Sequence, residues 1–175
     1  MAADDTTPET SSCAYVVGDD GLAQWSDVHA DAWIGMLETH KRLTRALEAE
    51  LEAEHGLSLS ATEVLGRLAA APGRSLRLSV LASECGLSLS RVSRIVDTLE
   101  GRKLVERHSC PGDARAVGAL LTDSGLTLIR TAQASHFASV QGRFFDELSA
   151  GEIRTLADIF ARFAPRAAEA CDSGE

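Results

Sequence analysis

Serine and arginine side chains recur at helical spacing between residues 88 and 94 of this 175-residue chain. They lie off the apolar face that begins at Val92, so on a helix they would point outward. An arginine guanidinium matches guanine O6 and N7 with two parallel hydrogen bonds, and free N–H groups at a helix N-terminus suit a phosphate. We therefore expect this segment to contact double-stranded DNA. The candidate contacts are Ser88, Ser90, Arg91, Ser93 and Arg94.

The charge is distributed unevenly along the chain. The formal net charge is -9, and residues 1–31 carry seven acids and no lysine or arginine. Residues 74–115 instead carry eight bases and five acids, a net charge of +3. A basic segment in an acidic protein is typical of a phosphate-backbone contact, and we assign Arg107 to that role. The alternative is a solvated surface on which these arginines pair with neighbouring acids.

Apolar periodicity and capping residues predict six helices and three short strands that would position these side chains. The helices are expected from Trp25 to about His55, Ser60 to Pro72, Ser79 to Gly86, Ser88 to about Arg102, Thr122 to about Phe145, and Ser149 onward. The strands are expected at Arg74–Leu78, Leu104–Ser109 and Ala116–Leu121, the last two joined by a turn at residues 110–113.

The predicted fold class is mainly α. Two short helices joined by a glycine turn and followed by a two-stranded hairpin form a winged helix-turn-helix. The remaining helices are more apolar than one small core requires, so we expect an N- and C-terminal helical dimerisation bundle. The predicted divisions are a flexible acidic tail (1–24), a dimerisation helix (25–58), the winged DNA-binding domain (59–122) and C-terminal dimerisation helices (123–175).

Several runs, in this order and spacing, resemble the MarR family of bacterial regulators over about residues 25–170. The runs are Leu81-Ala82-Ser83-Glu84-Cys85-Gly86-Leu87-Ser88, Val92-Ser93-Arg94-Ile95-Val96-Asp97-Thr98-Leu99-Glu100, Lys103-Leu104-Val105-Glu106-Arg107, Asp113-Ala114-Arg115 and Leu121-Thr122-Asp123-Ser124-Gly125. The resemblance implies a homodimer that binds a pseudo-palindromic operator, usually as a repressor. It also implies release by a small aromatic or phenolic ligand.

The resemblance gives the turn between the two wing strands a role. In the family the acid at the position of Asp113 holds the loop and orients the arginine at the position of Arg115 toward the minor groove. The alternative for Asp113 is an ordinary turn residue. Two positions depart from the family pattern, since Ala114 replaces a frequent second arginine and Cys85 replaces an aliphatic residue.

A candidate effector site follows from two residues on the first predicted helix. Trp33 and His40 are two turns apart and share a face, where an indole and an imidazole could hold an aromatic carboxylate or a phenol. Arg77 is the candidate partner of a carboxylate. The alternative is that Trp33 packs in the core.

Other classes of protein are not supported by the sequence. We find no phosphate-binding glycine loop, nucleophile elbow or metal-ligand spacing, so we expect no enzyme, catalytic residue, metal or cofactor. We also find no signal peptide and no run of about 20 apolar residues, and expect a cytoplasmic protein with no membrane partner.

The cysteines leave one alternative function open, a thiol-based redox sensor. Cys85 would pack as a small apolar side chain, Cys110 would be exposed on the wing, and Cys13 and Cys171 belong to the ends of the chain. We expect that peroxide does not control DNA binding through them. A second alternative is a dimeric interaction protein whose winged domain no longer reads DNA.

Overall fold

The computed structural model describes residues 15–163 except 111–112. The chain divides into two units, residues 1–46 and 47–175, which join within one long helix. No helix in the described part of the chain is long and apolar enough to cross a membrane.

The first unit contains an antiparallel hairpin followed by a helix. Strands β1 (Tyr15–Val17) and β2 (Ala23–Trp25) pair Tyr15 with Trp25 across the ladder. The turn between them uses Gly21 at a φ of 78°, a left-handed conformation that glycine adopts without strain. Helix α1 (Asp27–His55) starts two residues after Trp25. The expected flexible tail over residues 1–24 is therefore wrong for residues 15–24, and residues 1–14 lie outside the described part.

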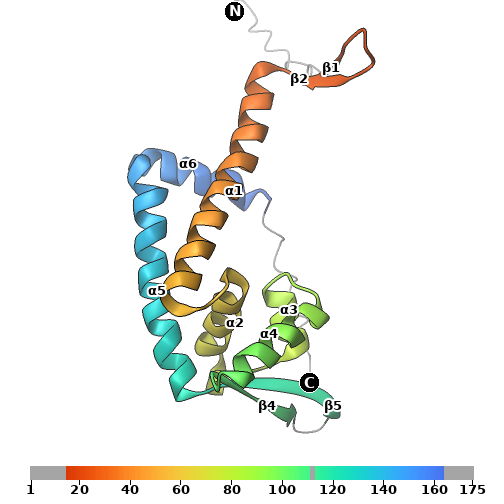
Figure 1. Cartoon of the computed structure of the whole chain (residues 1–175). Coiled ribbons are helices and arrows are strands. Elements are labelled where there is room, and N and C mark those ends of the chain that lie inside the picture. The colour runs from red at the N-terminus through yellow and green to blue at the C-terminus, as the bar shows by residue number, and fades with distance from the viewer. Residues whose placement is uncertain (1–14, 111–112, 164–175) are drawn as a thin grey trace, which may run out of the picture. The chain divides into compact units, whose positions relative to one another are not determined.

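The second unit contains the last turns of α1 and all of the following elements (Figure 1). They are α2 (Leu59–Ala70), a 3-10 turn η1 (Pro72–Arg74), β3 (Ser75–Arg77), α3 (Leu78–Glu84), α4 (Leu89–Gly101), β4 (Val105–Cys110), β5 (Asp113–Leu121), α5 (Asp123–Arg143), a second 3-10 turn η2 (Phe145–Glu147) and α6 (Ala150–Ala161). The three strands form an antiparallel sheet in the order β3-β5-β4. Each element predicted from the sequence between residues 59 and 161 is present, with ends shifted by one or a few residues.

The core of the second unit lies where the helices meet the sheet. Helices α2, α3 and α4 contact one another, and each contacts a strand of the sheet (Figure 1). Leu65 and Leu68 of α2, Leu81 of α3 and Ile129 of α5 are completely buried there. Burial of these aliphatic side chains supplies the main driving force for folding this unit.

Helix starts follow the capping rules with two corrections. Ser88, Thr122 and Ser149 cap α4, α5 and α6, and Ser149 forms a reciprocal capping box with Glu152. Helix α2 is capped by Ser58, whose hydroxyl accepts a hydrogen bond from the N–H of Ala61, and not by Ser60. Helix α3 starts at Leu78 without a side-chain cap, because β3 leads directly into it, so Ser79 is not its cap.

Gly125 lies in the first turn of α5, where the helix contacts the backbone of Leu104, the residue before β4. A Cβ atom at this position would lie 2.1 Å from the carbonyl oxygen of Leu104, which is backbone. We expect Gly125→Ala to lower the free energy of unfolding by about 1–3 kcal/mol through overpacking. Chemical denaturation followed by circular dichroism measures this change.

The matched control lies on the same helix. Gly142 has nothing closer to its Cβ position than a side-chain oxygen of Asp146 at 4.0 Å. Gly142→Ala should therefore raise stability by up to about 1 kcal/mol, the ordinary helix-propensity gain. Equal effects at the two positions would contradict the steric role of Gly125.

Candidate nucleic-acid interface

Helix α4 separates an apolar face from a polar face, as its sequence pattern predicts. Val92, Val96 and Leu99 are buried. Ser90, Arg91 and Arg94 are exposed on the remaining surface of the helix. These three candidate DNA contacts are therefore available to a ligand in solution, whereas Ser93 is only partly exposed.

The N-terminus of α4 is organised by Ser88. Its hydroxyl accepts a hydrogen bond from the N–H of Arg91 at 3.3 Å and lies 3.1 Å from the hydroxyl of Ser90. This cap satisfies one of the free N–H groups and leaves the others of the first turn directed along the helix axis. Ser88 therefore shapes an N-terminus of the kind that binds phosphates.

The two exposed arginines of α4 differ in their surroundings. Arg91 donates from Nη2 to the hydroxyl of Ser60, on the first turn of α2, at 3.2 Å. Arg94 makes no ion pair with any residue whose side chain the structure describes. Arg91 is thus positioned by a contact with the neighbouring helix, and Arg94 has no such contact among the described side chains.

Arg107, predicted as a phosphate contact, is engaged within the protein. From β4 its Nη2 donates to Asp97 Oδ1 at 2.6 Å and to the hydroxyl and carbonyl oxygens of Ser93 at 2.9 and 3.0 Å. Its Nε lies 3.6 Å from a carboxylate oxygen of Glu100. The side chain is only 25% exposed. Arg107 and Ser93 therefore join β4 to α4, and the predicted DNA contacts of both residues stay predictions.

Other members of the basic segment are also paired inside the chain. Arg102 donates to the carbonyl oxygens of Gly56 and His55 at 2.6 and 3.1 Å, and Arg74 pairs with Asp123 at 2.7 Å. Arg77 and Lys103 are exposed. The net charge of the segment therefore overstates the number of cations that are free for a phosphate backbone.

The wing is the hairpin of β4 and β5, and part of it is held by a histidine. Nε2 of His108 lies 2.7 Å from the hydroxyl of Ser75 on β3, so its ring spans β5. A Cβ on Gly118 would lie 2.5 Å from that ring, so only glycine fits beneath it. Asp113 and Arg115 belong to β5, but side chains 110–116 lie outside the described part, and their predicted roles stay predictions.

The predicted effector residues line neither the cavity between α2 and α5 nor the cavity between α1 and α5. Trp33 and His40 are exposed on the first unit, and Arg77 is exposed on the second. A cavity of about 580 Å³ lies instead between α2 and α5. Its lining includes Gly66, Arg67, Gln133, His136 and Phe137. Sequence reasoning missed it because no local pattern indicates that α2 and α5 face each other.

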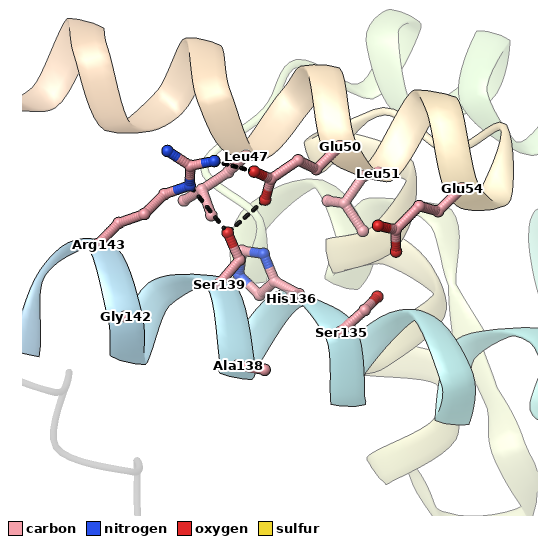
Figure 2. Close-up of a pocket in the computed structure, with 10 residues that line it drawn as sticks. All are labelled: Leu47, Glu50, Leu51, Glu54, Ser135, His136, Ala138, Ser139, Gly142 and Arg143. Atoms are coloured by element: carbon pink, nitrogen blue, oxygen red, sulfur yellow. Dashed lines mark hydrogen bonds and ion pairs between the residues drawn. The ribbon is translucent and has the colours of Figure 1, made fainter.

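A second, more polar cavity of about 360 Å³ lies between the end of α1 and α5. Figure 2 shows Arg143 and Ser139 of α5 directed toward Glu50 of α1, and both bond its carboxylate. The Ser139 hydroxyl and the Arg143 guanidinium hold the pKa of the Glu50 carboxyl below its ordinary value. The contribution of this bridge is therefore present at neutral pH and is lost as the pH falls through the lowered pKa.

Cys85 has the surroundings of a packing residue. It is partly buried against the core, and burial raises the pKa of its thiol, with Glu63 adding to the effect. A raised pKa disfavours the thiolate that oxidation requires. The side chain of Cys110 and residues Cys13 and Cys171 lie outside the described part.

Comparisons with known proteins agree with this geometry. A sequence profile described as MarR family matches residues 55–116. The chain is 33% identical to AbsC, a MarR family transcriptional regulator from Streptomyces coelicolor, with a TM-score of 0.76 over 81% of this chain and 95% of AbsC. It is 30% identical to Sco3205 from the same organism, solved in complex with DNA, with a TM-score of 0.76 over 81% of this chain and 89% of that protein. It is 27% identical to the regulator PcaV, also from Streptomyces coelicolor and solved with its natural ligand, with a TM-score of 0.62 over 71% of this chain and 88% of PcaV.

The positioning role of Arg107 predicts a stability effect. Arg107→Ala removes charge-assisted hydrogen bonds to Asp97 and Ser93, so the free energy of unfolding should fall by roughly 1–2 kcal/mol. Amide exchange in β4 should become faster, which hydrogen–deuterium exchange detects. Arg94→Ala is the control, because Arg94 has no described ion-pair partner and should leave both measurements unchanged. Equal stability of wild type and Arg107→Ala would remove the positioning role.

Proposed function

Because the chain belongs to the MarR family of transcriptional regulators, we propose that it binds a pseudo-palindromic operator as a homodimer and represses transcription until a small molecule releases it. Membership makes it a DNA-binding regulator and not an enzyme. The single observation that supports operator reading is α4, which has a capped N-terminus and exposes Arg91 and Arg94 opposite its buried face.

The operator contacts are assigned by what each side chain can reach. Arg94 is exposed and reads a base edge, for which guanine is the best geometric match. Ser88, Ser90 and the helix N-terminus bond phosphates. Lys103 adds an exposed cation beside the wing, and Arg115 enters the minor groove with Asp113 holding the loop, as the family resemblance implies. The basic face is retained, which disfavours a winged domain that no longer reads DNA.

The homodimer is supported by apolar surface that a monomer would leave in water. Ile159, Phe160 and Phe163 at the end of α6 are exposed, as is Phe137 of α5. Exposed apolar side chains of this size are typical of an association surface. A twofold-symmetric pair would present two α4 helices to the two half-sites of a pseudo-palindrome.

We place the effector in the cavity between α2 and α5. Its volume of about 580 Å³ suits a small aromatic molecule. Phe137 offers a ring for stacking, and Arg67, whose side chain is half exposed, can bind a carboxylate. Nδ1 of His136 is buried and has no hydrogen-bond partner in the described part of the chain, so a ligand could satisfy it. Trp33, His40 and Arg77 remain the alternative site, with an aromatic carboxylate or a phenol as effector in both cases.

One hydroxyl group connects the lining of this cavity to helix α4. Ser60 lines the cavity and also accepts the hydrogen bond from Arg91 of α4. A molecule that displaces the Ser60 hydroxyl would change where Arg91 is held. This contact supports a mechanism in which the effector changes the operator affinity through Arg91, and linkage requires that the operator lower effector affinity by the same factor.

A redox-sensing function is the second candidate. The raised pKa of the Cys85 thiol disfavours it for that residue. Cys110 remains the other thiol near the wing. We retain the prediction that peroxide does not release the operator.

Operator reading is tested by comparing three exposed cations. Duplexes selected from a random pool supply the operator, and fluorescence anisotropy supplies affinities. Arg94→Ala should weaken the selected duplex by roughly 1–3 kcal/mol and relax the preference at one position of each half-site. Lys103→Ala should weaken selected and random duplexes alike and reduce the salt slope by about 1. Arg130→Ala, an exposed arginine on α5, is the control and should change neither. A loss at Arg94 that is equal on both duplexes would reject its role in base reading.

Effector coupling is tested with benzoate, 4-hydroxybenzoate and phenol as probes. For a probe that lowers operator affinity, Ser60→Ala should itself lower effector-free operator affinity, because Arg91 loses its hydrogen-bond acceptor. It should also reduce the fold-change caused by the probe by at least about threefold. Ser83→Ala, an exposed serine on α3, is the control. Phe137→Ala should weaken probe binding itself in a thermal-shift assay. If only Trp33→Phe and His40→Ala abolish the response, the effector site is the alternative one.

A further inference from the structure

The first unit has no core of its own. None of residues 15–46 is buried. Ten large apolar side chains are exposed between residues 15 and 37. They are Tyr15, Val16, Val17, Leu22, Trp25, Val28, Trp33, Ile34, Met36 and Leu37. Apolar surface of this extent is rare on a folded monomer, so this unit requires a covering surface.

The hairpin within this unit is well specified by its sequence. Gly21 closes the turn, and the side chain of Asp20 accepts a hydrogen bond from the N–H of Leu22 at 3.0 Å. Tyr15 and Trp25 pack edge to face with ring centroids 5.8 Å apart. These features select the register, but a two-stranded hairpin without a packing partner is marginally stable at best. Its aromatic pair therefore needs contacts from elsewhere.

Charge limits what can cover the hairpin. Asp19 and Asp20 occupy its turn, and Asp27 and Asp31 occupy the first two turns of α1. No lysine or arginine lies between residues 15 and 40. Nucleic acid and anionic lipid surfaces would be repelled, and the exposed aromatic and aliphatic side chains indicate an apolar protein surface.

The connection to α1 identifies that protein surface. Only Ser26 separates β2 from α1, and its carbonyl oxygen accepts a hydrogen bond from the N–H of Ala30. No flexible linker therefore separates the hairpin from the helix. A copy of the chain that packs on the exposed Trp33, Ile34 and Leu37 of α1 would meet the hairpin as well. A symmetric pair supplies this contact twice, because each copy presents the same surface.

We propose that the β1–β2 hairpin is a dimerisation arm whose Tyr15–Trp25 face packs against a second copy of this chain. The arm extends the homodimer of the proposed function, on which this inference rests, beyond its helices. Val17 and Ala23 lie on the same face as the aromatic pair, while Val16 and Gln24 lie on the opposite face. The arm thus has one covered face and one face in solvent.

The fluorescence of Trp25 tests coverage directly. The chain has two tryptophans, so Trp33→Phe leaves Trp25 as the only one. Its emission should be blue-shifted at micromolar concentration and should move to the red on dilution, together with dimer dissociation measured by sedimentation velocity. An emission maximum typical of an indole in water at concentrations where the protein is dimeric would overturn the proposal.

Two variants test the energetic contribution of the arm. Tyr15→Ser with Trp25→Ser should raise the dimer dissociation constant at least about tenfold, as expected for buried aromatic anchors. Val16→Ser, on the opposite face, is the matched control and should change it by less than about threefold. Circular dichroism verifies that the helices persist in both. An unchanged dissociation constant in the double variant would overturn the proposal.

Operator binding separates this inference from the proposed function. Above the dissociation constant of the variant dimer, the double variant should bind the selected operator like wild type. A wild-type dimer that selects no operator would reject the proposed function and leave the arm intact. A dimer that binds operator but is insensitive to the double variant would reject the arm alone. A chain that is monomeric at all concentrations would reject both.

Discussion

The burial of Val92, Val96 and Leu99 in the core of the second unit is the constraint on which the DNA-reading surface depends. Because α4 packs against α2, α3 and β4, its rotation about its own axis is fixed. The polar face must then point outward, and the N-cap at Ser88 fixes where the helix begins.

The arginines near this helix divide into those that build the surface and those that can bind. Arg107 is held by Asp97 and Ser93, and Arg102 by backbone carbonyl oxygens. These contacts engage guanidinium groups that a count of charges treats as free. Arg94 keeps an exposed guanidinium, while Arg91 lies between the two groups because Ser60 accepts one of its hydrogen bonds. Ser60 also lines the α2–α5 cavity, so this contact connects Arg91 to that cavity.

The two units differ in how they satisfy their apolar side chains. The second unit buries leucines and valines from α2, α3, α4 and the sheet, whereas residues 15–46 bury none. In the proposed dimer, association would stabilise this unit and would couple folding of the hairpin and of the first half of α1 to protein concentration. The winged domain has its own core, so its folding does not require that association.

The sequence by itself determined the winged helix-turn-helix, the outward face of α4 and the caps at Ser88, Thr122 and Ser149, because periodicity and capping are local. It did not reveal the hairpin, whose strands are three residues each and lie in an acidic segment. The internal role of Arg107 and the α2–α5 cavity were decided by tertiary structure alone. Both depend on which elements pack side by side, and that is a property of the whole fold and not of local spacing.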